Sequence, residues 1–378
     1  MNRDLSATSI HNASWAGRGA LAIYVIVLLY ASLYPFVGWR IPEAFTLLIW
    51  PRYSGAFDIG LNVVAYLPLG ALLAARARRR LGSIRVVGAV LVRIGAQCVT
   101  LAFALSLLLE LLQALLPTRV SSPLDLAANT LGAALGAGAM LIAPGRALLA
   151  QAERWRRRHF AAEPETDWGI LLLVLWLFAQ MNPAIPFFEA GNFLNPLSPA
   201  LRPDPYDARI LLPQASAIAL NVAGFALFVS LLLQPHARTV LSVLMLLSLG
   251  LAAKLAMAAL MLKAPQLIDW LGPATVIGLG AGLLLFGALK NIGYRWRAFG
   301  ATLCVFAGAL MAKLTSIYSA LDEMLRLFDW PHGHLVNFAS LTRWVHEAWP
   351  FTAFLFLAVV FVYHSAHKMA AQPDRTLP

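Results

Sequence analysis

Charged residues are scarce in this chain of 378 residues, because Asp, Glu, Lys and Arg make up only 12% of it while hydrophobic residues make up 60%. Soluble domains usually carry about twice that share of charge, roughly 25%. A soluble protein of this length would need more polar residues to cover its surface than this chain has. The shortage of charge therefore excludes an ordinary soluble protein and predicts an integral membrane protein.

Cysteine is nearly absent as well, since the chain has only Cys98 and Cys304, which excludes a disulfide scaffold. The chain also lacks a phosphate-binding glycine loop, a nucleophile elbow and a dinucleotide fingerprint. Asp329, His332 and His334 lie close together in the sequence and are of the types that bind zinc. Their segment, rich in Pro and Gly, is more typical of a solvated loop, and we expect neither a metal nor a cofactor.

Long apolar runs are abundant, and the mean hydropathy is +0.71. A membrane-spanning helix needs about 20 mostly apolar residues. Ten segments fit this requirement, at residues 19–35, 59–75, 91–116, 125–143, 168–182, 210–233, 240–262, 267–289, 299–317 and 347–365. The first is not a cleaved signal peptide, because its run ends in bulky residues without a cleavage site. We therefore predict an all-α fold, a polytopic transmembrane helix bundle of about ten spans.

The chain has a net charge of +11, and the distribution of its basic residues between the two sides of the membrane indicates how the spans are oriented. With both termini on one side, that side receives 18 of the 29 Lys and Arg residues, the other side receives 9, and 2 fall within spans. Cytoplasmic loops are enriched in Lys and Arg, so both termini are predicted to be cytoplasmic. The basic balance is thus explained by topology, and no nucleic-acid partner is expected. A basic connector at residues 146–167 is either an interfacial helix on anionic lipid or simply a topological anchor, and the anchor is favoured.

An internal duplication is suggested by recurring patterns. Leu61-Asn62-Val63 recurs as Leu220-Asn221-Val222, and the 15-residue spacing from Glu110 to Asp125 recurs from Lys254 to Asp269. This predicts a parallel repeat of four spans plus four, with two C-terminal spans added. The predicted domains are 1–145, the connector 146–167, a degenerate second repeat at 168–290, and the last two spans with their outer loop at 291–378.

Polar residues inside the predicted spans form three helical stripes. An ionisable group in hydrocarbon costs several kcal/mol, so each requires an explanation. The stripes are Asp58, Asn62 and Tyr66; Ser106, Glu110 and Gln113; and Asp125, Asn129 and Gly132. Each points toward the outer half of the bilayer. A short loop after residue 116 places Ser122 and Arg119 above them, where the Arg119 guanidinium would reach the carboxylates and clamp an anion.

A structural explanation accounts for part of this set. Amide and hydroxyl side chains in membrane helices often only join neighbouring helices. Asp58, Ser122 and Asp125 are also typical of helix N-termini, where such groups cap the backbone. Glu110 is the strongest functional candidate, because it is an acid in the middle of a helix with no capping role. The candidate ligand-binding residues are Asp58, Asn62, Tyr66, Glu110, Gln113, Arg119, Ser122, Asp125 and Asn129, with Glu110 and Asp125 as candidate catalytic groups.

Three spaced motifs occur together in the first part of the chain: Tyr34-Pro35-Phe36-x-Gly38-Trp39, Asp58-x-x-x-Asn62-x-x-x-Tyr66-x-Pro68-x-Gly70 and Glu110-x-x-Gln113-x-x-x-Pro117-x-Arg119-x-Ser121-Ser122-x-x-Asp125-x-x-x-Asn129-x-x-Gly132. With these motifs, residues 21–143 resemble the VanZ-like family of bacterial membrane proteins. The resemblance implies a multi-pass protein of the bacterial inner membrane and an association with resistance to the glycopeptide teicoplanin. The second half departs from the pattern, because Lys254 stands where an acid is expected.

Three functions follow as alternatives. The first is an accessory cell-envelope protein that binds an anionic membrane lipid or a lipid-linked glycan precursor in the outer leaflet. The second is a membrane enzyme of phospholipid or polyprenyl-linked glycan metabolism, with Glu110 or Asp125 as general base. The third is a transporter, suggested by the repeat and by the intramembrane Glu110 and Lys254. The sequence assigns no oligomeric state.

Overall fold

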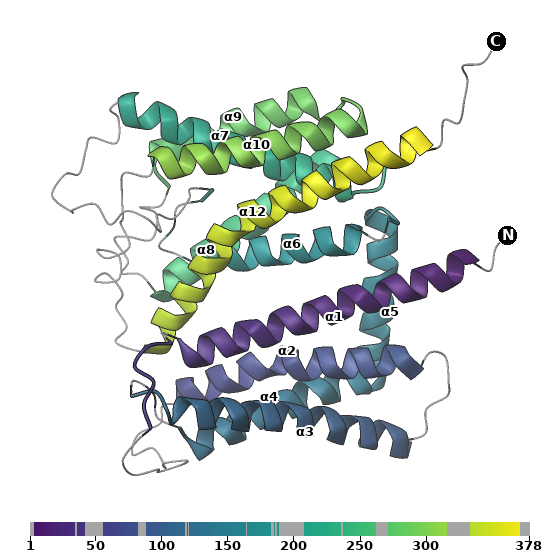
Figure 1. The fold of residues 1–378 in the computed structure, drawn as a ribbon, viewed down its shortest axis with the longest axis vertical. Coiled ribbons are helices and arrows are strands. Elements are labelled where there is room, and N and C mark those ends of the chain that lie inside the picture. Colours follow the sequence, from purple (N-terminus) through teal and green to yellow (C-terminus); the bar gives the residue numbers. More distant parts are fainter. Residues whose placement is uncertain are drawn as a thin grey trace. The chain divides into compact units, whose positions relative to one another are not determined.

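The computed structural model describes residues 4–34, 36–41, 56–81, 88–117, 119, 121–163, 165–182, 185, 187–188, 208–235, 237–261, 271–315 and 333–370. Its described part is built of α-helices (Figure 1). They are α1 (Asp4–Leu33), α2 (Ala56–Leu81), α3 (Gly88–Gln113), α4 (Pro123–Leu141), α5 (Ala143–His159), α6 (Thr166–Ala179), α7 (Ala208–Leu232), α8 (Thr239–Met261), α9 (Pro273–Leu289), α10 (Tyr294–Thr315) and α12 (Gly333–Ala370).

Each of the ten predicted apolar segments falls on one of these helices. Seven contain a stretch long and apolar enough to cross a membrane, on α2, α3, α4, α7, α8, α10 and α12. Three more are shorter apolar helices, at Gly19–Leu33, Thr166–Ala179 and Pro273–Leu289. Large apolar side chains also point outward from the helices, and Val92 and Leu284 are 73% and 78% exposed. These findings confirm the predicted all-α, polytopic helix bundle.

The chain forms two compact units, which we call unit 1 (Met1–Arg158) and unit 2 (His159–Pro378). Unit 1 contains α1 to α4 and nearly all of α5. Unit 2 contains α6 to α12. The division falls within the basic connector that the sequence analysis marked at residues 146–167.

In unit 1, α2 and α4 pack together through small residues. A Cβ atom added at Gly132 would collide with the backbone oxygen of Val63, and one added at Gly136 would collide with that of Leu67. Both contacts advance by four residues on each helix, so the two helices run in the same direction. Glycine permits this close approach because it has no side chain. The contact fixes the facing sides of α2 and α4.

In unit 2, α7 lies at the centre of the core, and the side chains of Phe225 and Phe228 on it are fully buried. Glycines again mediate close packing, with Gly278 of α9 against Ile218 and Gly308 of α10 against Asn221. The same type of contact therefore occurs in both units, while the duplication itself stays a prediction.

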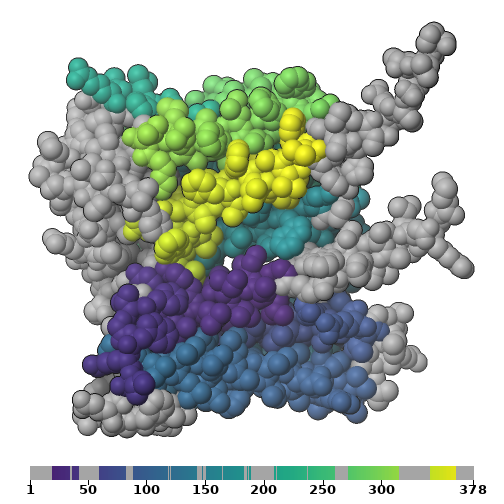
Figure 2. Space-filling model, viewed as in Figure 1, coloured from purple at the N-terminus to yellow at the C-terminus, as the bar shows by residue number. Residues whose placement is uncertain are grey.

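The last two spans, predicted as an addition to the repeat, belong to this core. Val305 of α10 and Leu357 of α12 are buried in it. The two helices lie side by side on one face of unit 2 (Figure 2).

The connector contains α5, which runs across the direction of α1 to α4 (Figure 1). It carries the exposed Arg154 and Arg158, an exposed Trp155, and an ion pair of 2.9 Å between Arg157 and Glu153. A basic helix with an aromatic side chain that crosses a bundle in this way has the geometry of a helix lying in the membrane plane. The choice between an interfacial helix and a topological anchor stays a prediction.

Candidate polar site of unit 1

Glu110, near the end of α3, is hydrogen-bonded to Ser122, the residue just before α4. The Glu110 Oε2 atom accepts a hydrogen bond of 2.8 Å from the backbone N–H of Ser122. The Ser122 hydroxyl in turn accepts from the backbone N–H groups of Leu124, at 3.2 Å, and Asp125, at 3.5 Å. Ser122 is thus the N-cap of α4, as its residue type suggested. Glu110 is only 3% exposed, so this backbone N–H is one of the few groups that stabilise its carboxylate.

Two asparagines tie the three helices together. The Asn62 Nδ2 atom on α2 donates to Asp125 Oδ1 on α4 at 2.8 Å. The Asn129 Nδ2 atom on α4 donates to the Ser106 hydroxyl on α3 at 2.9 Å, and this pair is buried. The structure therefore brings members of all three predicted stripes into one polar cluster. We call it the polar site, and it consists of Asn62, Tyr66, Ser106, Glu110, Ser121, Ser122, Asp125 and Asn129.

Three buried polar atoms of this site make no hydrogen bond of good geometry to any described residue. They are the hydroxyl oxygens of Tyr66 and Ser121 and the Oδ1 atom of Asn129. Tyr66 lies close to Ser106 and Glu110, and Ser121 lies close to Glu110. Buried polar groups in proteins are nearly always paired, and each unpaired one costs about 1–3 kcal/mol. Three such atoms in one cluster make the polar site the candidate for a binding site in unit 1.

Arg119 is the main departure from the sequence-based expectation. Its Nη2 atom donates to the backbone oxygens of Tyr34, at 3.0 Å, and Ala31, at 3.4 Å. It therefore caps the C-terminal end of α1, where carbonyl groups lack helical partners, and does not pair with the carboxylates of the polar site. Burial lowers the pKa of the Arg119 guanidinium, which still stays protonated at neutral pH.

Gln113 and Asp58 complete the predicted set. The Gln113 Nε2 atom donates to the backbone oxygen of Ser32 at 3.0 Å, so this side chain also holds the end of α1. Asp58 lies in α2, but its side chain falls outside the described part of the structure. The polar site thus contains six of the nine predicted residues, while Gln113 and Arg119 form its boundary with α1.

Ser106 and Ser121 of the polar site, and Tyr24 beside it, were not among the predicted ligand-binding residues, although Ser106 was placed on one of the three stripes. Ser121 precedes the cap and was overshadowed by Ser122, although two adjacent serines after a mid-helix acid were a usable signal. Tyr24 of α1 donates from its hydroxyl to the backbone oxygen of Ala65 at 2.7 Å, next to Tyr66. A tyrosine in the middle of an apolar span was the only indication of this contact.

The residues of unit 2 that the predicted repeat matches with Asn62 and Glu110 make different contacts. The Asn221 Nδ2 atom donates to the backbone oxygen of Phe188 at 3.1 Å. Lys254 is fully buried, and its Nζ atom donates to the backbone oxygens of Asn182 and Ile185, each at 2.6 Å. Lys254 of α8 therefore binds the segment that follows α6 through two hydrogen bonds, and its role is structural. Its predicted counterpart Asp269 lies outside the described residues.

Metal ligands do not gather in the described ranges, where no group of three His, Cys, Asp or Glu side chains could hold an ion. Of the three residues considered for zinc, Asp329 and His332 lie outside the described residues, and the side chain of His334 is not described either.

The fold and this site together define a multi-pass helical membrane protein with a buried acid–amide site between three of its helices. Residues 12–144 match the family model described as VanZ/LLP1. The match covers about a third of the chain and includes every residue of the polar site, which confirms the resemblance, so unit 1 carries a VanZ-like domain. No curated protein and no solved structure matches the chain.

Proposed function

We propose that this protein is an accessory membrane protein of the bacterial cell envelope that binds a lipid-linked glycan precursor at the polar site of unit 1. The observation that carries this proposal is the set of three buried polar atoms of the polar site, in Tyr66, Ser121 and Asn129, that lack a hydrogen bond of good geometry to the described residues. Through this binding the protein would affect susceptibility to glycopeptides such as teicoplanin, because these drugs act on the cell wall that such precursors build.

Hydroxyl groups are the ligand chemistry that the polar site suits best. Glu110 and the Oδ1 atom of Asn129 present acceptor oxygens, which favour a donor and disfavour an anion. The Tyr66 and Ser121 hydroxyls can each donate or accept, so they suit either the hydroxyl or the ring oxygen of a sugar. A sugar of the glycan would satisfy all of these atoms together.

A phosphate would fit beside Arg119, outside the acid cluster. Both hydrogen bonds of Arg119 use the same terminal nitrogen, Nη2, which leaves Nε and Nη1 without a partner among the described residues. Arginine binds phosphate well because its planar fork supplies parallel donors. The diphosphate of a lipid-linked precursor would then lie at the boundary with α1, and its sugar would lie toward Glu110. An anionic phospholipid would use Arg119 alone.

The proposed location is the outer leaflet of the inner membrane, with both termini in the cytoplasm. The distribution of Lys and Arg, 18 on one side against 9 on the other, supports this orientation. In that orientation the connection between α3 and α4 faces outward. Glu110 is three residues before the end of α3, or roughly 5 Å inward at 1.5 Å per residue.

A second candidate function, a membrane enzyme, is supported by the position of Glu110 beside two hydroxyls. A carboxylate within about 3 Å of a proton in a buried site is suited to act as a general base. Glu110 would then activate a substrate hydroxyl that approaches it beside Tyr66 and Ser121. Binding without turnover is the simpler proposal, because no second catalytic group is paired with Glu110 in the described structure.

The experiment uses the full-length protein in nanodiscs with a radiolabelled polyprenyl-diphosphate sugar. Wild type is compared with Glu110→Gln, which keeps the shape and an acceptor for Ser122, and with Arg119→Ala. Arg78→Ala is the matched control. Arg78 also donates to a backbone oxygen at a helix end, that of Met140 at 2.7 Å, but this is the C-terminal end of α4, away from the polar site at its N-terminal end.

The accessory function predicts binding without chemical change, weakened about tenfold or more in both site variants and nearly unchanged in Arg78→Ala. Turnover that disappears in Glu110→Gln would replace this proposal with the enzyme. Uptake of the ligand into sealed vesicles would replace it with a transporter. Equal binding by wild type and both site variants would contradict the site itself.

A further inference from the structure

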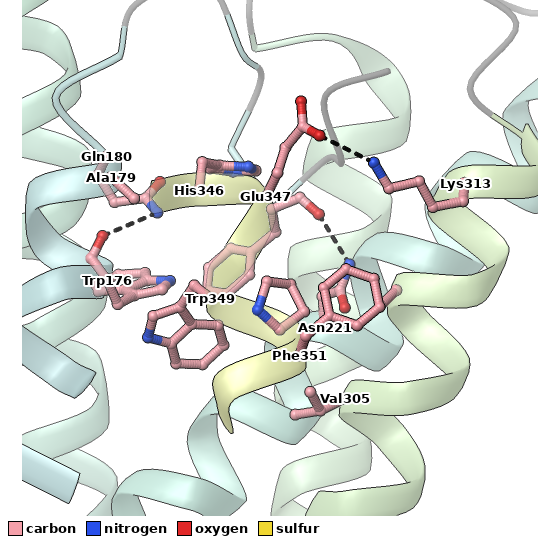
Figure 3. A pocket seen from close by; sticks show the side chains of 13 residues that line it. Trp176, Ala179, Gln180, Asn221, Val305, Lys313, His346, Glu347, Trp349 and Phe351 are labelled. Atoms are coloured by element: carbon pink, nitrogen blue, oxygen red, sulfur yellow. Dashed lines mark hydrogen bonds and ion pairs between the residues drawn. The ribbon is translucent and has the colours of Figure 1, made fainter. Parts of the chain in front are cut away.

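Unit 2 contains a pocket of its own, outside the segment that matches the VanZ/LLP1 model (Figure 3). It is a cavity of about 40 Å³, which is room for roughly three water-sized groups. Residues of α6, α7, α10 and α12 line it, together with Phe188 after α6. None of these residues belongs to the polar site of unit 1.

Two buried polar atoms in this pocket make no hydrogen bond to any described residue. Gln180 is only 1% exposed, and its Nε2 atom donates to the backbone oxygen of Trp176 at 3.3 Å while its Oε1 atom is unpaired. The Nδ1 atom of His346 is also buried and unpaired. In addition, Pro350 has no N–H, so the backbone oxygen of His346 lacks its usual helical partner. Most of these atoms are acceptors, and they call for a ligand that donates hydrogen bonds.

The charged residues at this pocket leave one net positive charge, because the two cations Lys313 and Arg343 share the single carboxylate of Glu347. The Glu347 carboxylate receives Lys313 on Oε2 at 3.2 Å and Arg343 on Oε1 at 3.1 Å. An anion would face the oxygen atoms of Gln180 and Glu347, which is unfavourable. A cation would be repelled by the excess positive charge of Lys313 and Arg343, which already occupy both oxygens of Glu347. A neutral donor is the remaining class.

The opposite side of the pocket is aromatic. Figure 3 shows Gln180, His346 and Glu347 along one side and Trp176, Trp349 and Phe351 along the other. These rings are held in place, because Trp349 Nε1 donates to the backbone oxygen of Leu172 at 2.7 Å and Trp176 stacks on Phe225 at 4.1 Å between centroids. A fixed aromatic wall facing a few polar groups suits a flat ligand with an apolar face and polar edges.

We propose that this pocket takes up a few hydroxyls of the neutral sugar or polyol head group of a membrane lipid, which donate to Gln180, while the ring of the head group stays at the opening beside the exposed Phe351. The location of the pocket favours a lipid as the source. Phe351 is 59% exposed, and His346 lies five residues, or roughly 8 Å, inside the apolar stretch that begins at Leu341. A ligand at that depth arrives along the membrane.

The test measures binding of a glucosyl-diacylglycerol to full-length protein by native mass spectrometry, after purification in a detergent without a sugar head group. Gln180→Leu removes the unpaired oxygen, and Phe351→Ala removes an exposed part of the aromatic wall. Gln234→Leu is the matched control, because Gln234 Nε2 also donates to one backbone oxygen, that of Phe160, at 2.9 Å and outside the pocket.

We expect Gln180→Leu to weaken glucosyl-diacylglycerol binding about tenfold or more and Phe351→Ala to weaken it roughly threefold to tenfold, with Gln234→Leu within about twofold of wild type. Competition by soluble methyl glucoside at equal concentration would support the same pocket chemistry with a free sugar as the source. Binding of phosphatidate in preference to the glycolipid, lost in Gln180→Leu, would overturn the proposal in favour of an anion. Equal glycolipid binding by wild type and both pocket variants would also overturn it.

Discussion

The Glu110 carboxylate accepts a 2.8 Å hydrogen bond from the backbone N–H of Ser122, the residue that caps α4. The carboxylate therefore lies at the N-terminal end of a helix, where the helix dipole and free N–H groups favour negative charge. This explains how an acid that is 3% exposed is accommodated between membrane helices. It also connects the stability of α4 with the state of the polar site.

The cap gives the first prediction. Ser122→Ala removes the acceptor for the N–H groups of Leu124 and Asp125, and we expect it to lower the free energy of unfolding by about 1 kcal/mol. Ser121→Ala removes a buried hydroxyl that lacks a good hydrogen bond, so we expect a change below about 0.5 kcal/mol. Thermal unfolding of both variants in the same detergent checks the difference. A larger loss in Ser121→Ala than in Ser122→Ala would contradict the assigned cap.

The contact between α2 and α4 gives the second prediction. Gly132→Ala places a methyl group against the backbone of Val63, and forcing the helices apart should cost about 1–3 kcal/mol. Gly138→Ala is the control on the same helix, because a Cβ there meets nothing within 4 Å and alanine is the better helix former. We expect Gly138→Ala to unfold at the same or a higher temperature than wild type. Equal destabilisation by both substitutions would show that the two helices do not pack as described.

The charge cluster of unit 2 gives the third prediction. Glu347 is shared by Lys313 and Arg343, and its side chain is only 6% exposed. Glu347→Gln leaves two cations facing each other, and we expect it to lower the free energy of unfolding by about 3 kcal/mol. Lys313→Met leaves the pair with Arg343 intact, and we expect a loss of about 1 kcal/mol. Chemical denaturation of the two variants measures the difference, and an equal loss would show that the carboxylate is not shared.

Membrane orientation gives the fourth prediction, and the two native cysteines make it simple to test. Cys98 and Cys304 are both buried, so their background reaction with a thiol reagent should be low. Arg40→Cys and Arg157→Cys introduce exposed cysteines that the charge distribution places on opposite sides of the membrane. We expect a membrane-impermeant maleimide to label position 40 in intact cells and position 157 only after permeabilisation. The reverse pattern would invert the topology and move the polar site to the inner leaflet.

The helix positions could be predicted because each depends only on local composition. A run of about 20 apolar residues has one stable arrangement in a bilayer, a helix that satisfies its own backbone. Spacing also identified which residues share a helix face, and this is why Asn62 of α2 and Asp125 of α4 were expected near each other before their 2.8 Å bond was seen. The packing of the last two spans could not be predicted, because burial of α10 and α12 against α7 depends on side-chain contacts that periodicity does not encode.

The sequence by itself determined that this is a membrane protein, where its helices lie, and which polar residues they carry, because these properties follow from residue type and spacing. Only the tertiary structure decided which partner each polar group takes. Arg119 binds the carbonyl oxygens at the end of α1 and not the carboxylates. Gln180 lies opposite aromatic side chains in a pocket that no sequence motif predicted. A hydrogen bond requires two atoms within about 3 Å of each other, and that proximity is set by how helices distant in sequence rotate and pack.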